Sequence, residues 1–375
     1  MYRETIEQLV SAGLNPGRTI AETKKETGKD LVGVFPIRTP EEIVYAAGCV
    51  PIGMWGGHTE ITLADKYLQS FCCSIMRINM EYALRGVYDG LKAVLIPTFC
   101  DTMKCIVENW KLALPQVPTI AFAYPQHHKL QTGMEFAVDE IRRVKHELEL
   151  ALHKIITYEQ VEEAFEVYEE YRQTMRTFTE LAAKHPEIIT AKKRYAIIKA
   201  GCYMDKAVYT RMIKEINEGL EKEKESTFRG IRAIVTGIMM EPVDVLDIFE
   251  ENDIAIVGDD LAIGSRLWRT PAREQVGDVY QKMAYIIHDI EGDTFFFDPE
   301  KKKGSMLIDM AHNLDADAVV VMMMKFCDPE EYDYPIYKAE LAEAGIPELY
   351  LEFDQQLSSF EQIRTRVQSF AEMLD

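Results

Sequence analysis

The sequence predicts an α/β protein with two Rossmann-like or flavodoxin-like parallel-sheet domains and a helical segment between them. Apolar strand-like runs alternate with helical patterns over residues 30–129 and again over 229–375, which is typical of parallel sheets covered by helices. Residues 130–228 have few Gly or Pro and place their apolar residues at helical spacing. The length of 375 residues also exceeds what one hydrophobic core usually holds, so we expect more than one domain.

An N-terminal helical segment is expected over residues 1–29, followed by the first α/β domain. The apolar runs of this domain predict strands at 31–35, 50–55, 92–97 and 119–124. Thr39 is expected to cap a helix that has Pro40 at its first position. Gly48 is expected to end that helix before the next strand begins.

The helical segment and the second α/β domain follow in order. Apolar residues from Ile141 to Ala182 predict amphipathic helices packed on the sheets, and the charged run 221–226 marks a boundary. In the second domain we expect strands at 233–238, 254–260, 316–324 and 348–354. Helices are expected at 241–252 and at the C-terminus, 359–374.

The two α/β domains repeat one local pattern. Each places Phe-Cys-Asp directly after a buried strand, at Cys100 in the first domain and Cys327 in the second. The interval from Pro118 to Gln126 also equals the interval from Pro347 to Gln355. An internal duplication is the simplest explanation of this match.

Composition excludes several classes of partner and location. Asp and Glu number 62 against 42 Lys and Arg, giving a formal charge of −20 that repels nucleic acids and anionic membranes. Glu4 and Glu7 interrupt any signal peptide, and no apolar run approaches the roughly 20 residues of a membrane span, so we expect a cytoplasmic protein. Seven cysteines, an odd number, argue against a disulfide framework.

The cysteines are the strongest chemical signal. Cys100 and Cys327 follow strands, and ligands of open α/β sheets bind beyond the carboxyl ends of the strands. Cys72 and Cys73 precede a helical pattern, where helix-end amides stabilise a thiolate. Three thiolates from three segments would suit an iron–sulfur cluster or a thiolate-rich zinc site. The alternative is that these thiols are buried as small hydrophobic groups.

Three further segments could face the same cleft. The Gly-rich turn 55–60 could line it or be a plain turn, and its Glu60 is a candidate catalytic carboxylate. Lys301 to Lys303 could meet a coenzyme phosphate, although a solvated loop is the simpler interpretation. The acidic clusters 259–260 and 328–331 follow strands and could face the cleft or cap helices.

The chain resembles the β subunits of the 2-hydroxyacyl-CoA dehydratases of amino-acid-fermenting anaerobes. The likeness runs nearly end to end, through FPIRTPEEIVYAAG, PIGMWGGHTE, SFCCSIM, PTFCDTMKC, FCDPEEYDYP and DQQLSSFEQIRTR. Within the family the chain is most similar to the 2-hydroxyisocaproyl-, phenyllactyl- and lactoyl-CoA enzymes. The motifs FCDPEEYDYP and PEE-x-x-x-AAG are specific to this superfamily.

The resemblance implies a heterodimer with a homologous α subunit, in which each subunit holds one [4Fe-4S] cluster on three cysteines. In this sequence the matching residues are Cys73, Cys100 and Cys327, and Cys105 is either a neighbour of the cluster or a fourth ligand. An ATP-dependent iron–sulfur activator protein would supply one electron, which turns the 2-hydroxyacyl-CoA substrate into a ketyl radical that expels its hydroxyl group. The product would be the (E)-2-enoyl-CoA, and this chain's cluster would relay electrons to the α subunit.

Two alternatives within the superfamily stay open. One is a subunit of a benzoyl-CoA-reductase-like enzyme, and the other is a stand-alone double-cubane electron-transfer protein. A metal-free α/β binding protein would leave the coincidence of cysteines in three segments unexplained.

Overall fold

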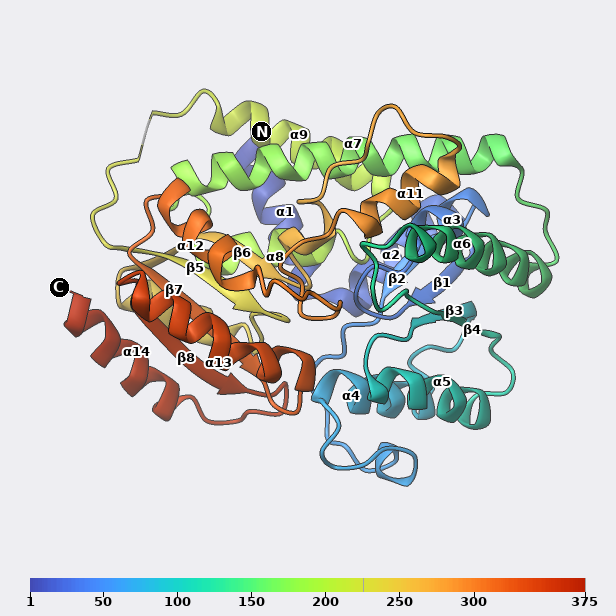
Figure 1. The fold of residues 1–375 in the computed structure, drawn as a ribbon, viewed down its shortest axis with the longest axis horizontal. Helices are drawn as coiled ribbons and strands as arrows, with labels where there is room; N and C mark the ends of the chain where they lie inside the picture. Colours follow the sequence, from blue (N-terminus) through green and yellow to red (C-terminus); the bar gives the residue numbers. More distant parts are fainter. Residues whose placement is uncertain (225, 375) are drawn as a thin grey trace.

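The computed structural model describes residues 1–224 and 226–374, whose strands form two four-stranded parallel sheets (Figure 1). The first sheet consists of β1 (Leu31–Val34), β2 (Val50–Gly53), β3 (Leu91–Pro97) and β4 (Thr119–Phe122). The second sheet consists of β5 (Ile231–Gly237), β6 (Ile254–Leu261), β7 (Ala318–Met324) and β8 (Glu348–Phe353). Each predicted strand is present, so the predicted α/β class is confirmed.

Both sheets have the same strand order. The first runs β2-β1-β3-β4 and the second β6-β5-β7-β8, and every neighbouring pair is parallel. The order reverses between β1 and β3 in one sheet and between β5 and β7 in the other, as in flavodoxin-like folds. Matching topology is what an internal duplication would produce, and the duplication itself stays a hypothesis.

Helices cover both sheets. Those of the first half are α3 (Glu41–Ala46), α4 (Ser74–Leu84) and α5 (Asp101–Ala113), with a short 3-10 helix, η1 (Ala64–Lys66). Those of the second half are α10 (Asp244–Glu251), η2 (Ser265–Leu267), α11 (Val279–His288), α12 (Lys303–Asn313), α13 (Asp328–Glu343) and α14 (Glu361–Leu374). In the part of the chain described here, no helix is long and apolar enough to cross a membrane.

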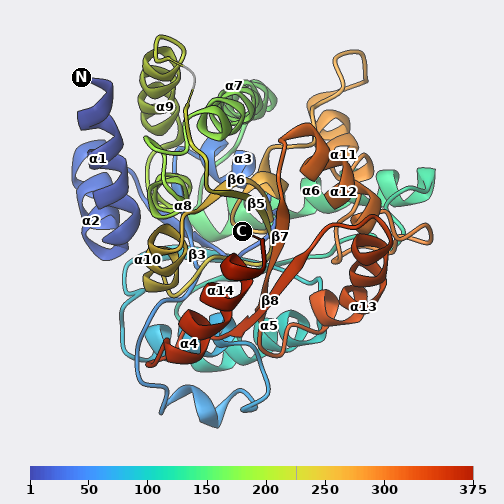
Figure 2. The ribbon, with the colours of Figure 1, turned by 90° about the vertical axis from the view of Figure 1, so that its left-hand side faces the viewer.

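The helices between the two sheets connect the halves. They are α6 (Gln131–Leu152), α7 (Tyr158–Lys184), α8 (Ala191–Ala200) and α9 (Lys206–Leu220). The long α7 runs along the top of the molecule past both halves (Figure 1). The N-terminal helices α1 (Tyr2–Leu14) and α2 (Pro16–Thr27) lie beside them, with α1 packed on α8 and α9 (Figure 2). Helix α11, although it comes late in the sequence, packs on α6.

One hydrophobic core continues through both halves. Its buried residues include Val94 and Leu95 of β3 as well as Val320 and Met322 of β7, each with no more than 1 % of its surface exposed. Burial of such side chains is the main force that stabilises a fold, at about 25 cal/mol per Å² of apolar surface. The two sheets are therefore held in a fixed relation by shared packing.

The predicted start of the helix after β1 is wrong by one residue. Pro40, not Thr39, is the N-cap of α3, which begins at Glu41. The Thr39 hydroxyl instead donates a 2.8 Å hydrogen bond to the carbonyl of Phe35. Because Ile37 and Arg38 both have positive φ, the chain turns sharply here, and Thr39 stabilises that turn rather than the helix end.

Candidate functional site

A cavity lies where the carboxyl ends of the central strands of both sheets meet. Pro36 and Ile37 follow β1, Ile238 follows β5, and the segments after β3 and β7 contribute Cys100 and Cys327. Both topological switch points therefore open onto one cavity, which is where open α/β sheets bind ligands. Apolar side chains, among them those of Ile75, Met76, Met103, Phe295 and Met324, form most of its wall.

The cavity brings together three cysteines that the sequence predicts to be ligands. Cys73, Cys100 and Cys327 all line it, and Cys72 does not. Each of the three is the N-cap of a helix: Cys73 of α4, Cys100 of α5 and Cys327 of α13. Helix N-termini carry free amide groups and a partial positive charge, so three positive helix ends surround the cavity.

Two opposing effects act on the protonation of the three thiols. Burial raises the pKa of Cys73 to about 12 and also raises the pKa of Cys100 and of Cys327. Backbone N–H groups in the first turn of each helix act in the opposite direction. A bound metal displaces the thiol proton, and the helix ends then stabilise the negative charge that stays on sulfur.

The donor chemistry of the three cysteines suits an iron–sulfur cluster. Thiolates are the ligands that such clusters use, and Cys73, Cys100 and Cys327 line one largely apolar cavity. Within residues 1–224 and 226–374, no group of three or more His, Cys, Asp or Glu residues could hold a single metal ion.

Two strained residues stand at this cavity. Ile37 has φ of 77° and Phe326, which directly precedes Cys327, has φ of 64°. A positive φ is costly for residues with a Cβ atom, and more so for a β-branched one. Such strain concentrates at functional sites, where it aims a neighbouring group. At this cavity the positive φ of Ile37 sets the direction of the turn after β1, and that of Phe326 sets the direction of the turn that presents Cys327.

A buried hydrogen-bond network connects the end of β8 to the helix that Cys73 caps. The backbone N–H of Gln355 donates to the Ser74 hydroxyl at 3.1 Å, and its side-chain amide donates to the Trp55 carbonyl at 2.9 Å and to Glu241 at 2.8 Å. A Cβ at Gly56 would stand 2.6 Å from the Gln355 side-chain oxygen, so only glycine fits there. The Gly-rich turn therefore lies on this network, beside a second cavity of about 770 Å³.

Glu81, which sequence reasoning missed, fixes the loop before Cys73. Its carboxylate accepts hydrogen bonds from the N–H groups of Thr62, Leu63 and Ala64 at 3.0, 2.7 and 2.9 Å, and pairs with Arg85 at 2.6 Å. Burial alone would raise the pKa of Glu81, but these donors lower it to about 2. The sequence does contain a signal that could have identified Glu81: it is a carboxylate on the apolar face of the helical pattern that forms α4.

A cluster of buried charges adjoins the cysteine cavity, and we call it the buried ion network. Its members are Arg38, Asp260, Arg266, Arg269, Asp293, Lys303 and Glu330. The interpretation of Lys301 to Lys303 as a solvated loop is wrong for Lys303, which is only 3 % exposed. The acidic pair 259–260 lies within the end of β6 rather than after it, and Asp260 from this pair and Glu330 from the cluster after β7 form ion pairs in the interior.

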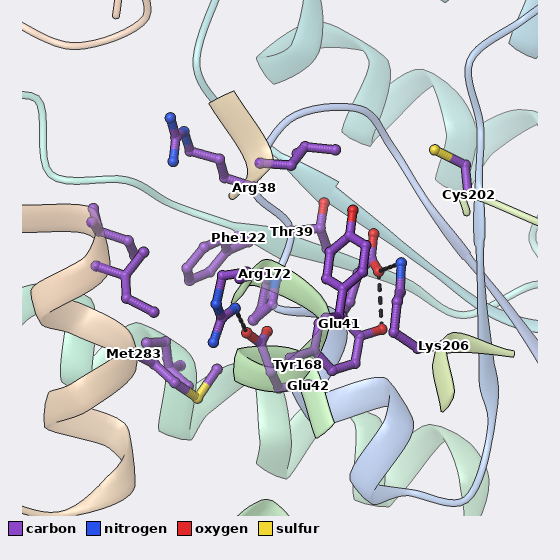
Figure 3. Close-up of a pocket in the computed structure, with 16 residues that line it drawn as sticks. Arg38, Thr39, Glu41, Glu42, Phe122, Tyr168, Arg172, Cys202, Lys206 and Met283 are labelled. Carbon is purple, nitrogen blue, oxygen red and sulfur yellow. Dashed lines mark hydrogen bonds and ion pairs between the residues drawn. The ribbon is translucent and has the colours of Figure 1, made fainter. Parts of the chain in front are cut away.

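A third cavity, of about 100 Å³, contains charges that pair with one another (Figure 3). Arg172 donates to Glu42 at 2.7 Å, while Lys206 and the Tyr168 hydroxyl reach the same oxygen of Glu41 at 3.2 and 2.9 Å. These pairs join α3 to α7 and α9. They hold the turn after β1 in place, which positions the wall of the cysteine cavity.

The remaining sequence candidates lie outside the cysteine cavity. Cys105 is exposed on α5 and Cys202 lies beside Gly53 at the end of β2. Cys49 is buried between α3 and β2. Glu60 is exposed, and its carbonyl accepts a 2.9 Å hydrogen bond from Arg85, so its catalytic role stays a prediction.

Comparison with known proteins agrees with this geometry. Residues 36–374 match the family model of the 2-hydroxyglutaryl-CoA dehydratase D-component. The chain is 42 % identical over 370 residues to the lactoyl-CoA dehydratase subunit beta of Anaerotignum propionicum, with 98 % of each chain covered. It is 40 % identical over 360 residues to the (R)-phenyllactyl-CoA dehydratase beta subunit of Clostridium sporogenes, with 96 % of each covered. The (R)-2-hydroxyglutaryl-CoA dehydratase subunit beta of Acidaminococcus fermentans is 33 % identical over 375 residues, with 98 % of each covered. The chain therefore belongs to the 2-hydroxyglutaryl-CoA dehydratase D-component family.

Proposed function

We propose that this chain is the β subunit of a 2-hydroxyacyl-CoA dehydratase and that Cys73, Cys100 and Cys327 hold a [4Fe-4S] cluster. The observation that carries the proposal is that three cysteines from three segments cap three helices around one cavity. The β-subunit names of the relatives at 40 and 42 % identity support the assignment to a dehydratase.

The cluster would store and pass on single electrons, and this chain's residues would prepare the place for it. Apolar side chains form most of the cavity wall, which lowers the local dielectric and strengthens electrostatic interactions inside. The amides of the three helix ends stabilise the negative charge of the thiolates. Strand ends from both sheets fix the positions of the ligands, so the site needs little rearrangement when an electron arrives.

The β-subunit names also support a homologous α subunit as partner. We infer that the α subunit binds the 2-hydroxyacyl-CoA substrate and receives electrons through this chain. The product is the (E)-2-enoyl-CoA, formed through a ketyl radical. An ATP-dependent iron–sulfur activator supplies the first electron, because the hydroxyl group at C2 is a poor leaving group without one.

Exposed aromatic residues beside the ligand cysteines are the surface we assign to the α subunit. Phe71 is 65 % exposed two residues before Cys73, and Phe326 is 49 % exposed directly before Cys327. Aromatic residues are enriched at protein interfaces, and electron transfer requires the partner to approach the cluster closely. We therefore expect F71D and F326D to weaken association at least tenfold, measured by titrating labelled α subunit. The control I155D, at a residue 85 % exposed between α6 and α7, should bind normally; equal weakening there would contradict this surface.

The ligand assignment is tested by single serine replacements. C73S, C100S and C327S should each prevent full cluster loading, because Ser is a poor iron ligand compared with a thiolate. C202S and C105S, at residues outside the cavity, should load normally. Iron and acid-labile sulfide are measured on protein purified without oxygen. Full loading of any of the first three variants would refute the assignment.

A further inference from the structure

The buried ion network lies next to the cysteine cavity. Arg266 is at its centre: it binds Asp260 through two hydrogen bonds of 3.0 and 2.9 Å and Glu330 through one of 2.6 Å. Lys303 reaches both carboxylates, each at 3.0 Å. Asp293 completes the network, 3.8 Å from Arg266 and 3.0 Å from Arg38.

The network has an excess of positive charge in a largely buried region, where only Arg269, 18 % exposed, is partly open to solvent. Four cations (Arg38, Arg266, Arg269 and Lys303) face three carboxylates (Asp260, Asp293 and Glu330), a net formal charge of +1. All three carboxylates have side chains no more than 1 % exposed. Salt and solvent screen such charges weakly, so their field acts on neighbouring groups at nearly full strength.

The network touches the wall of the cysteine cavity at three points. Glu330 lies in the first turn of α13, and its backbone N–H is bonded to the carbonyl of the capping residue Cys327 at 3.0 Å. Arg38 directly follows Ile37, which lines the cavity. Phe295 lines the cavity too, and its N–H donates to Asp293 at 3.1 Å. After burial, the Glu330 carboxylate is the next cause that raises the pKa of Cys327.

We propose that the buried ion network sets the reduction potential of the cluster held by Cys327, with Lys303 and Glu330 as positioning residues that act through its charge. The proposal rests on the proposed function, since it needs a cluster in this cavity. Each electron that enters a cluster adds one negative charge there. A fixed positive excess beside Cys327 stabilises the reduced state, so removing a positive charge must shift the potential to more negative values, and removing a negative charge must shift it to more positive values.

The test is a pair of substitutions that remove charges of opposite sign from the network. K303Q removes a positive charge and should move the potential of this chain's cluster to more negative values, whereas E330Q removes a negative charge and should move it to more positive values. K303R keeps the charge and should restore a potential near that of the wild type. A tenfold change in the ratio of reduced to oxidised cluster corresponds to 59 mV for a one-electron couple. We expect each shift to reach about that size.

The measurement is a redox titration followed by electron paramagnetic resonance on the anaerobic complex with its α subunit. Matched controls are K145Q and E149Q, which remove partly buried charges of the same two signs from an ion pair on α6, outside the cysteine cavity and the network. Opposite shifts for K303Q and E330Q, with unchanged controls, would support the proposal.

Shifts of the potential in the same direction for both variants, or no shift at full iron content, would overturn the proposal and leave the proposed function standing. A wild-type chain that binds no iron would overturn the proposed function itself. If E330Q fails to load iron, the comparison of K303Q with K303R decides alone.

Discussion

At the scale of single residues, Glu81 shows how one buried carboxylate fixes a loop that has little regular structure. It satisfies three consecutive backbone N–H groups of the segment that leads to Cys73. Buried amides that lose their acceptor cost about 1–3 kcal/mol each. The position of the loop, and with it the entry of the chain into α4, therefore depends on this side chain.

We expect E81Q to lower the free energy of unfolding by about 2 kcal/mol at pH 7, because a neutral amide is a weaker acceptor for these donors. The pKa of Glu81 is about 2 in the folded chain against an ordinary 4.5. Its contribution is therefore complete above about pH 4.5 and is lost as the pH falls toward 2. Denaturant titrations of both proteins from pH 7 downward should show their difference shrinking below pH 4.5. The exposed E60Q serves as control, and a difference that grew with acid would contradict the account.

At the scale of secondary-structure elements, the helix N-termini combine a structural and a chemical role. Cys is an unusual N-cap, because Ser, Thr, Asp and Asn satisfy the free amides better. At α4, α5 and α13 the sequence nevertheless places Cys at this position. The choice makes sense if the thiols serve a ligand more than they serve the helix ends.

A direct consequence is that C73S, C100S and C327S should not weaken the iron-free fold. The serine hydroxyl accepts hydrogen bonds from the same first-turn amides, so the free energy of unfolding should stay within about 1 kcal/mol of the wild type or exceed it. Denaturant unfolding of iron-free samples provides the measurement. T157A, which removes the capping box of α7, is the positive control and should lose about 1 kcal/mol. A loss of several kcal/mol in the serine variants would mean that the thiols are packing groups.

At the scale of the whole molecule, the two sheets are joined by packing, by the buried hydrogen bonds of Gln355 to Ser74 and Trp55, and by a buried ion pair beside the cysteine cavity. Arg38 comes from the turn after β1 and Asp293 from the segment before α12, and their side chains are 8 % and 0 % exposed. Because Cys73, Cys100 and Cys327 come from both halves, any relative movement of the sheets would separate them. The pair therefore helps to keep the site assembled.

We expect D293N to destabilise the chain by about 3 kcal/mol, since it leaves the Arg38 charge buried without its partner. R38M should also destabilise, but the double variant R38M/D293N should lose clearly less than the sum of the two. Denaturant unfolding of the four proteins gives this coupling directly. Simple additivity would show that the two side chains do not depend on each other.

The sequence predicts local structure and the cysteine cavity well, because both follow from short-range rules. Buried strands are visible as apolar runs, and Cys100 and Cys327 directly follow two of them. The helical pattern that follows could place only the pair Cys72 and Cys73 with them, and the choice of Cys73 comes from the family resemblance.

Tertiary partners could not be predicted in the same way. Lys303 looks like its exposed neighbours in the sequence, and only the fold brings it to Asp260 and Glu330. His128 is similar: only the fold buries it, to 2 % exposed, and brings it within 2.9 Å of the Ile290 carbonyl. The packing of α11 on α6 likewise could not be predicted from the spacing of apolar residues. That spacing shows that a helix has an apolar face, but it does not show which element covers the face.

The measurement that tests the central claim most directly is the iron and acid-labile sulfide content per chain, on protein purified without oxygen. Occupation of Cys73, Cys100 and Cys327 by one [4Fe-4S] cluster predicts about four iron atoms and four sulfides per chain. About eight of each would indicate a double-cubane electron carrier instead. No iron after verified anaerobic reconstitution would mean that the three cysteines only pack against their neighbours, and would contradict the account.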